Sequence, residues 1–250
     1  MNDRLWWRWS WRDLRGRWGA VATIAAVIAI GTGVYSGLGS TAAWREQSND
    51  RSFAALHMHD LRAELSPGTF AMKGELQAAA RSIEHSAWIE RVDERLLVES
   101  SIDATDTAAP GGDVILVMAR LVGAAYGDPA ALDDRWVARG SGDGAVLELK
   151  FADYYGLPAS GSVEVAGGET VRYSGLGVAP EELYVLGPEG SVLAQADVAT
   201  LYLPLVEAQR LTGRVDAVND VVLTLAAGAD RAVVETELEA ALSSAWSATV

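Results

Sequence analysis

The chain has 250 residues, a formal net charge of −14 at neutral pH and no cysteine. A chain of this length buries one large core or two modest ones, and the lack of cysteine excludes a disulfide framework and thiol chemistry. The acidic balance argues against a nucleic acid partner, because a negatively charged surface repels phosphate groups.

The longest uncharged stretch covers residues 18–44, a run of 27 residues. As a helix it is about 40 Å long, whereas the hydrocarbon core of a bilayer is about 30 Å thick. Trp18 and Trp44 bracket the run, where aromatic side chains favour the two headgroup layers. We therefore predict a transmembrane helix over residues 18–44, with the most apolar part at about 19–38.

Small side chains are unusually frequent inside this helix. Twelve of the twenty residues from 19 to 38 are Ala, Gly, Ser or Thr. Ala25, Ala29, Gly33 and Gly37 recur four apart and form one smooth stripe, which lets helix backbones approach closely in lipid. The plainer alternative is that Ala and Gly are simply common here. We favour a helix-packing surface for further transmembrane helices or for a second copy of the chain.

Residues 1–17 carry five arginines against two aspartates, together with several tryptophans. A basic face opposite an aromatic face predicts an interfacial helix on an anionic leaflet of the lipid bilayer. The predicted membrane-interface residues are Trp7, Trp11, Trp18, Trp44, Arg4, Arg8, Arg12 and Arg15. The positive-inside rule places the N-terminus in the cytoplasm and residues 45–250 on the extracytoplasmic side of the cell membrane. A cleaved signal peptide is the main alternative, but its apolar core is only about 7–15 residues long.

Residues 45–250 hold 15 basic and 32 acidic residues, a net charge of −17. We predict a stalk and the first half of a core domain over 45–104, an inserted subdomain over 105–200 and the second half of the core over 201–250. The expected fold class is α+β, with a split βαβ/βαβ domain that carries a mostly-β insertion.

Apolar periodicity predicts the individual elements of this domain. The first half of the core has a strand at 56–65, a helix at 70–85 and a strand at 89–100. The second half has a strand at 218–225 and a helix at 231–243, which Asp230 caps, and the last strand should begin at the chain end. Strands of the insertion are predicted at 113–121, 146–149, 161–165, 170–173, 183–186, 192–194 and 198–203, and a short helix at 205–211.

Support for catalysis or a cofactor is poor. His57 and His59 lie two apart on a predicted strand and form a candidate metal pair with His85 or Asp60. Two histidines on one strand are more often a surface coincidence, and we expect no metal. The sequence has no phosphate-binding loop and no nucleophile elbow. We therefore expect a protein that is not an enzyme and has no cofactor.

A family resemblance rests on the arginine-rich start with Asp13, Leu14 and Arg15, on the single membrane helix and on several stretches of the domain. These stretches are residues 138–140, 146–152, 155–157, 175–184 and 218–223. Together they resemble the N-terminal part of FtsX-like ABC transporter permeases with a MacB-type periplasmic core domain. The motifs are loose patterns rather than catalytic signatures.

The resemblance implies a permease whose separate cytoplasmic ATPase subunit hydrolyses ATP. The membrane helices then pass the motion to the extracytoplasmic domain, which exports or releases a lipid, lipoprotein, peptide or drug. Such permeases carry further membrane helices after the core domain, and none follows here, so we expect a fragment or a truncated form. The alternatives are a single-pass membrane-anchored binding or scaffold domain, which leaves the small-residue stripe unexplained, and an anchored hydrolase, which lacks a nucleophile-base set.

Overall fold

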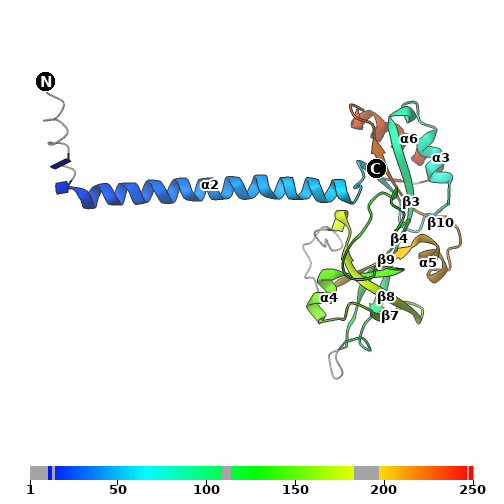
Figure 1. Ribbon diagram of the computed structural model, residues 1–250. Coiled ribbons are helices and arrows are strands. Elements are labelled where there is room, and N and C mark those ends of the chain that lie inside the picture. Colours follow the sequence, from blue (N-terminus) through cyan, green and yellow to red (C-terminus); the bar gives the residue numbers. More distant parts are fainter. Residues whose placement is uncertain (1–10, 13–14, 109–113, 183–196, 247, 250) are drawn as a thin grey trace. The chain divides into compact units, whose positions relative to one another are not determined.

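The computed structural model describes residues 11–12, 15–108, 114–182, 197–246 and 248–249 (Figure 1). The chain divides into two compact units, residues 1–52 and residues 53–250. Of the predicted interface residues, Trp7, Arg4 and Arg8 lie outside the described part of the chain, as does the side chain of Trp44.

Helix α2 (Trp18–Ala55) is 38 residues long. Its segment Trp18–Gly37 is long and apolar enough to cross a membrane, and its described side chains are exposed. The two threonine hydroxyl groups of this segment are satisfied within the helix, since Thr23 Oγ1 donates to Gly19 O (2.9 Å) and Thr32 Oγ1 donates to Ile28 O (2.7 Å). Internal satisfaction of this kind is what a hydrocarbon environment requires. The helix continues through the polar residues that follow the apolar segment, up to Ala55.

The core of the second unit is a four-stranded antiparallel arrangement in the order β12-β1-β11-β3. Helix α3 (Glu75–Arg81) connects β1 (Leu61–Leu65) to β3 (Ile89–Asp103), and helix α6 (Arg231–Ala245) connects β11 (Asp220–Leu225) to β12 (Ala248–Thr249). Each βαβ unit therefore has a strand of the other unit between its own two strands. The predicted α+β fold with a split βαβ/βαβ core is confirmed.

One face of these strands packs against both helices. The buried residues on the helices recur at helical spacing, and they meet alternate residues of β1 and β11 in one apolar core. Caps fix where the helices begin: Glu94 accepts from Gly74 N and Gln77 N at the start of α3, and Asp230 accepts from Ala232 N and Val233 N at the start of α6. The core residues on these elements are Leu61, Ala63, Leu65, Leu76, Ala80, Val221, Leu223, Val234, Leu238 and Leu242.

The insertion extends the same sheet beyond β3, in the order β4-β9-β6-β8-β5. Strand β9 is parallel to β4, while β7 forms a hairpin with β8 and also pairs with the far end of β3. The elements are β4 (Leu116–Ala124), β5 (Trp136–Gly140), β6 (Ala145–Glu148), α4 (Leu149–Tyr155), β7 (Gly161–Val165), β8 (Glu169–Val178), the 3-10 helix η2 (Pro180–Glu182) and β9 (Val198–Pro204). Helix α5 (Leu205–Leu211), a small sheet of β2 (Ala71–Met72) with β10 (Ala217–Val218), and the 3-10 helix η1 (Ser86–Trp88) complete the fold.

Two predicted elements are too long, and the strand predicted at 170–173 is too short, since β8 covers Glu169–Val178. The strand expected at 56–65 is only β1, because residues 56–60 turn: His57 has a φ of 52°, and the carbonyls of Leu56 and His57 accept from the loop at 133–134. The helix expected at 70–85 shrinks to α3, since Gly74 (φ 97°) breaks the chain before it. The predicted strands at 183–186 and 192–194 lie outside the described residues.

Strand β3 is the element that joins the two parts of the sheet. Its residues 89–95 pair with β11, and its residues 96–103 pair with β4 on the opposite edge. We call β12, β1, β11 and residues 89–95 the core half, and residues 96–103 with β4 to β9 the insertion half. Figure 1 shows α3 and α6 at one end of this domain and β7 and α4 at the other, with β3 between them.

Candidate functional site

The predicted helix-packing residues Ala25, Ala29, Gly33 and Gly37 lie on α2 at the expected spacing. A Cβ atom built on Gly33 or Gly37 meets no atom of the described residues within 4 Å, apart from the nearby backbone of its own helix. Neighbouring large side chains of the same segment are also open, with Tyr35 82% and Trp18 71% exposed. This segment therefore has its apolar surface available to lipid or to another helix. Trp11, which lies before it, is exposed as well.

A leucine at Gly33 tests whether this stripe packs against a partner helix. Because a Cβ atom at Gly33 meets nothing within 4 Å outside the nearby backbone of its own helix, we attribute a loss of association to a neighbour that this backbone approaches closely. We expect association of the full-length chain with its membrane partners, or with a second copy, to weaken by about 1 kcal/mol or more. Crosslinking in membranes measures the association, and Gly31→Leu, on the opposite face of the helix, is the control. Equal crosslinking of both variants and the parent would assign the helix to anchoring alone.

The second unit contains a buried network of charged side chains on the face of the core strands that the helices do not cover. Arg95 and Asp220 are directly opposite each other on β3 and β11, and both are almost completely buried. Arg62 lies on the same face of β1. Two further carboxylates, Asp133 before β5 and Glu181 in η2, come from the insertion half.

Arg95 is the centre of this network. Its Nε donates to Asp220 Oδ1 (2.6 Å), and its Nη1 donates to Asp133 Oδ2 (3.0 Å) and to Glu181 Oε1. Its Nη2 donates to Glu181 Oε2 (3.3 Å). The planar guanidinium fork suits several carboxylates at once, whereas an ammonium group offers only one nitrogen.

Arg62 bonds to the second carboxylate oxygen of Asp220. Arg62 Nε donates to Asp220 Oδ2 (2.5 Å) and its Nη2 donates to Glu64 Oε2 (2.7 Å) at the exposed rim. Burial by itself would raise the pKa of Asp220, but the charges of Arg95 and Arg62 and their hydrogen bonds lower it below its ordinary value. Burial likewise works against the charged form of Arg95, yet the charges of Asp220, Glu181 and Asp133 raise its pKa well above the ordinary value.

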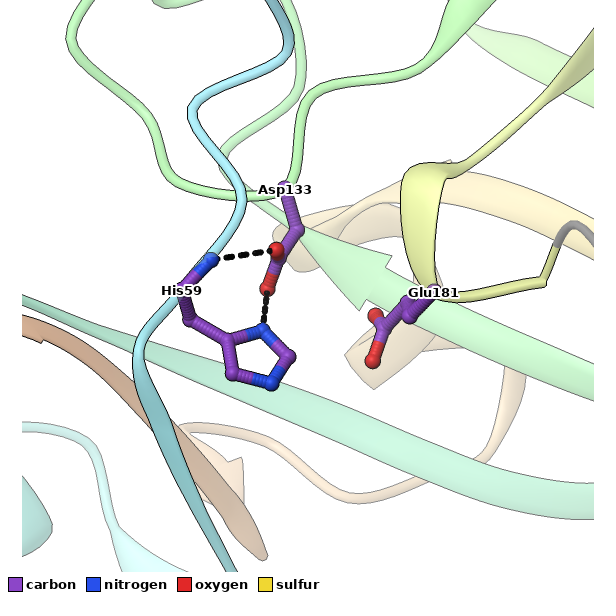
Figure 2. A group of neighbouring side chains, drawn as sticks. All are labelled: His59, Asp133 and Glu181. Atoms are coloured by element: carbon purple, nitrogen blue, oxygen red, sulfur yellow. Dashed lines mark hydrogen bonds and ion pairs between the residues drawn. The ribbon is translucent and has the colours of Figure 1, made fainter. Parts of the chain in front are cut away.

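His59 connects the segment that follows α2 to this network. Its backbone N donates to Asp133 Oδ1 (3.1 Å), and its Nδ1 lies 2.7 Å from Asp133 Oδ2 (Figure 2). The backbone N of Asp133 donates to His57 O (3.1 Å), and that of Asp134 donates to Leu56 O (3.0 Å). The residues after Ala55 are therefore attached to the loop before β5 by both backbone and side-chain bonds.

His59, Asp133 and Glu181 bring candidate metal-ligand atoms within 4.8 Å of one another (Figure 2). However, Arg95 Nη1 bonds to both Asp133 Oδ2 and Glu181 Oε1, so a protein cation already occupies the position between these carboxylates. A divalent ion would have to displace a buried guanidinium. The geometry is that of an ion-pair network rather than a metal centre.

The three histidines do not come together as one site. His85 lies with Glu84 and Glu237, where its Nδ1 is 2.6 Å from Glu237 Oε1 and fastens the turn after α3 to α6. His57 is exposed, and Asp60 accepts from Leu225 N (2.7 Å). The candidate metal set drawn from the sequence is therefore not assembled.

Sequence reasoning missed the charged network altogether. The available signal was Asp220, a carboxylate inside the apolar run 218–225, at a position that alternates with the residues expected to face the core. A charged residue inside a strand calls for a partner of opposite charge when the strand is buried on both faces. The identity of that partner, Arg95, is not readable from the run itself.

No protein-family model matches the chain, and no curated protein matches it. Among solved structures, the chain is similar to the periplasmic region of MacB from Actinobacillus actinomycetemcomitans, with 10% sequence identity over 81% of this chain and 92% of that chain and a TM-score of 0.48. It is also similar to the extracellular domain of the noncanonic ABC-type transporter YknZ from Gram-positive bacteria, with 10% identity over 76% of this chain and 98% of that chain and a TM-score of 0.45.

Proposed function

We propose that the chain is a permease-type component of an ABC transporter. In this proposal α2 crosses the cell membrane with its N-terminus in the cytoplasm, and residues 53–250 lie on the extracytoplasmic side. A separate cytoplasmic ATPase subunit supplies the energy. The extracytoplasmic domain uses it to export or release a lipid, lipoprotein, peptide or drug.

The observation that carries the proposal is the unbroken connection between the apolar segment and the domain. Helix α2 runs without interruption from Trp18 to Ala55, and the residues directly after it are bonded to the loop before β5. A Gly/Ser-rich linker would behave as a flexible coil and absorb a displacement, whereas a helix is stiff along its axis. The family resemblance of the stretches at 138–140, 146–152, 155–157, 175–184 and 218–223 adds independent support.

The sequence has no phosphate-binding loop, so we propose that the chain itself does not hydrolyse ATP. The full chain purified alone is expected to show no ATP turnover. The complex isolated from native membranes in mild detergent, through a tag on this chain, is expected to hydrolyse ATP. Turnover by the chain alone would contradict the proposed division of labour, and a complex without ATPase activity would favour the membrane-anchored scaffold instead.

The same tagged chain tests the proposed orientation. Since the chain has no cysteine, a cysteine at the exposed position Arg172 is a unique label site. Arg172→Cys is expected to react with a membrane-impermeant maleimide in intact cells, and Asn2→Cys only after lysis. The reverse pattern would invert the topology inferred from the N-terminal arginines.

A further inference from the structure

The two halves of the sheet overlap over very few residues. Arg95, which lies opposite Asp220, is the last residue of β3 that pairs with β11. The next residue, Leu96, lies opposite Gly123 and is the first that pairs with β4. Directly beyond this point the Asn219 side chain continues the β11 edge of β3, because its Oδ1 accepts from Leu97 N (2.8 Å) and its Nδ2 donates to Leu97 O (2.9 Å). Strand β7 pairs with the same edge farther along, at residues 102–103. Among the described strands, β3 alone belongs to both halves. The step at residues 95–97 is thus the place where the hydrogen-bond ladder of the sheet passes from one half to the other, within one apolar core.

Arg95 bonds to both halves across this step. On one side it holds Asp220 of the core half, and on the other it holds Asp133 and Glu181 of the insertion half. These two carboxylates lie on the segment that leads into β5 and on the segment that follows β8. Arg95 therefore bonds to the segments at both ends of the 136–178 excursion, next to further bonds between the halves such as Leu132 N to Asp93 Oδ2 (2.6 Å).

The backbone at this position is held in an uncommon conformation. Asp133 has a φ of 53° and His57 a φ of 52°, and non-glycine residues adopt this left-handed region only at an energetic cost. Such conformations persist where the surrounding contacts over-determine them, often at elements that switch. Here the contacts are the ion pairs of Asp133 and its bonds to His57 and His59. If these contacts open, the local backbone is free to relax.

We propose that Arg95 is a conformational clamp that sets the angle between the core half and the insertion half. When its bonds to Asp133 and Glu181 open, the insertion half rotates about residues 95–97 of β3. This geometry does not depend on the transporter assignment, and only the purpose of the motion rests on the proposed function. In a transporter, a displacement of α2 reaches His59, which is bonded to Asp133 and so acts directly on the clamp.

Spin labels on the two halves of the full chain, in lipid nanodiscs, measure this angle as a distance. The exposed positions Ala78 on α3 and Arg172 on β8 accept cysteines in a chain that has none of its own. The parent is expected to give one narrow distance distribution. Arg95→Lys keeps the charge but has a single nitrogen in place of the fork, so it is expected to broaden the distribution or add a second population. Arg139→Lys is the matched control and should resemble the parent. Arg139 lies on β5 and forms an exposed ion pair with Asp153 of α4.

A second variant removes the charges of the two insertion-side carboxylates, which weakens their bonds to Arg95, and leaves Asp220 in place. The double substitution Asp133→Asn with Glu181→Gln is expected to change the distribution as Arg95→Lys does, at temperatures well below the melting transition. If Arg95→Lys does not fold, this double variant tests the clamp. If the double variant does not fold either, Glu181→Gln alone tests it, because Glu181 is partly exposed. A merely structural role would lower the melting temperature and leave one narrow distribution, and that result would overturn the clamp. The measurement needs no ATPase, so its failure is distinguishable from failure of the transporter proposal.

Discussion

Replacing Asp220 by asparagine is expected to destabilise the second unit by about 3–5 kcal/mol at neutral pH, the range for removing one partner of a buried ion pair. The substitution keeps the size of the side chain and removes its charge. Arg95, which is 1% exposed, then loses its Nε counter-ion, and Arg62 loses the carboxylate at 2.5 Å. Urea unfolding of the full chain in detergent measures the loss. Asp153→Asn, in a half-exposed pair with Arg139, is the control and should change stability by less than about 0.5 kcal/mol.

The loss in Asp220→Asn is also expected to depend on pH. The folded-state pKa of Asp220 is lowered relative to an unfolded value of about 3.9. Its contribution is therefore present above that unfolded value and disappears as the pH falls through the lower folded pKa. The gap between parent and variant should be full at pH 7 and narrow in strong acid. A gap that is below 1 kcal/mol at pH 7, or is constant with pH, would contradict the role assigned to this charge.

Replacing Gly140 by alanine is expected to destabilise the same unit by about 2–5 kcal/mol, as the sum of two costs. Gly140 ends β5 with a φ of 87°, a region where a side chain costs about 1–2 kcal/mol. A Cβ atom there would also lie 2.2 Å from Ser174 O and 2.7 Å from the Cα of Gly175. Because both atoms belong to the backbone of β8, the contact can be relieved only by moving the strand, which adds about 1–3 kcal/mol.

Gly144 provides a control that separates the two costs. It has a nearly identical φ of 82°, but a Cβ atom built on it meets nothing within 4 Å. Gly144→Ala should therefore lose only the conformational part, about 1–2 kcal/mol. Urea unfolding of both variants compares them directly. Equal losses would mean that the close approach of β5 and β8 at Gly140 is less tight than the structure shows.

The sequence by itself determined those features that depend on neighbours in the chain. The uncharged run from residue 18 predicted a helix, because hydropathy along one helix is a local property. The bounds of β7 and α5 agree with the predicted ranges 161–165 and 205–211, and Asp230 caps α6 as expected. The split βαβ/βαβ core also followed from the order of strands and helices, because each helix has an apolar face that must be buried against a sheet.

Only the tertiary structure decided the strand order, the short extent of β1 and the existence of the charged network. Arg95 and Asp220 are 125 residues apart in the chain, and Arg62 and Asp220 are 158 residues apart. Arginine and aspartate are residue types that usually lie on the solvated surface, so neither type by itself predicts burial. They are buried because residues 56–60, the loop before β5 and η2 converge on one face of the core strands. Which charges meet there is set by strand register and by loops that cross from distant parts of the chain, and no local pattern of residues encodes either.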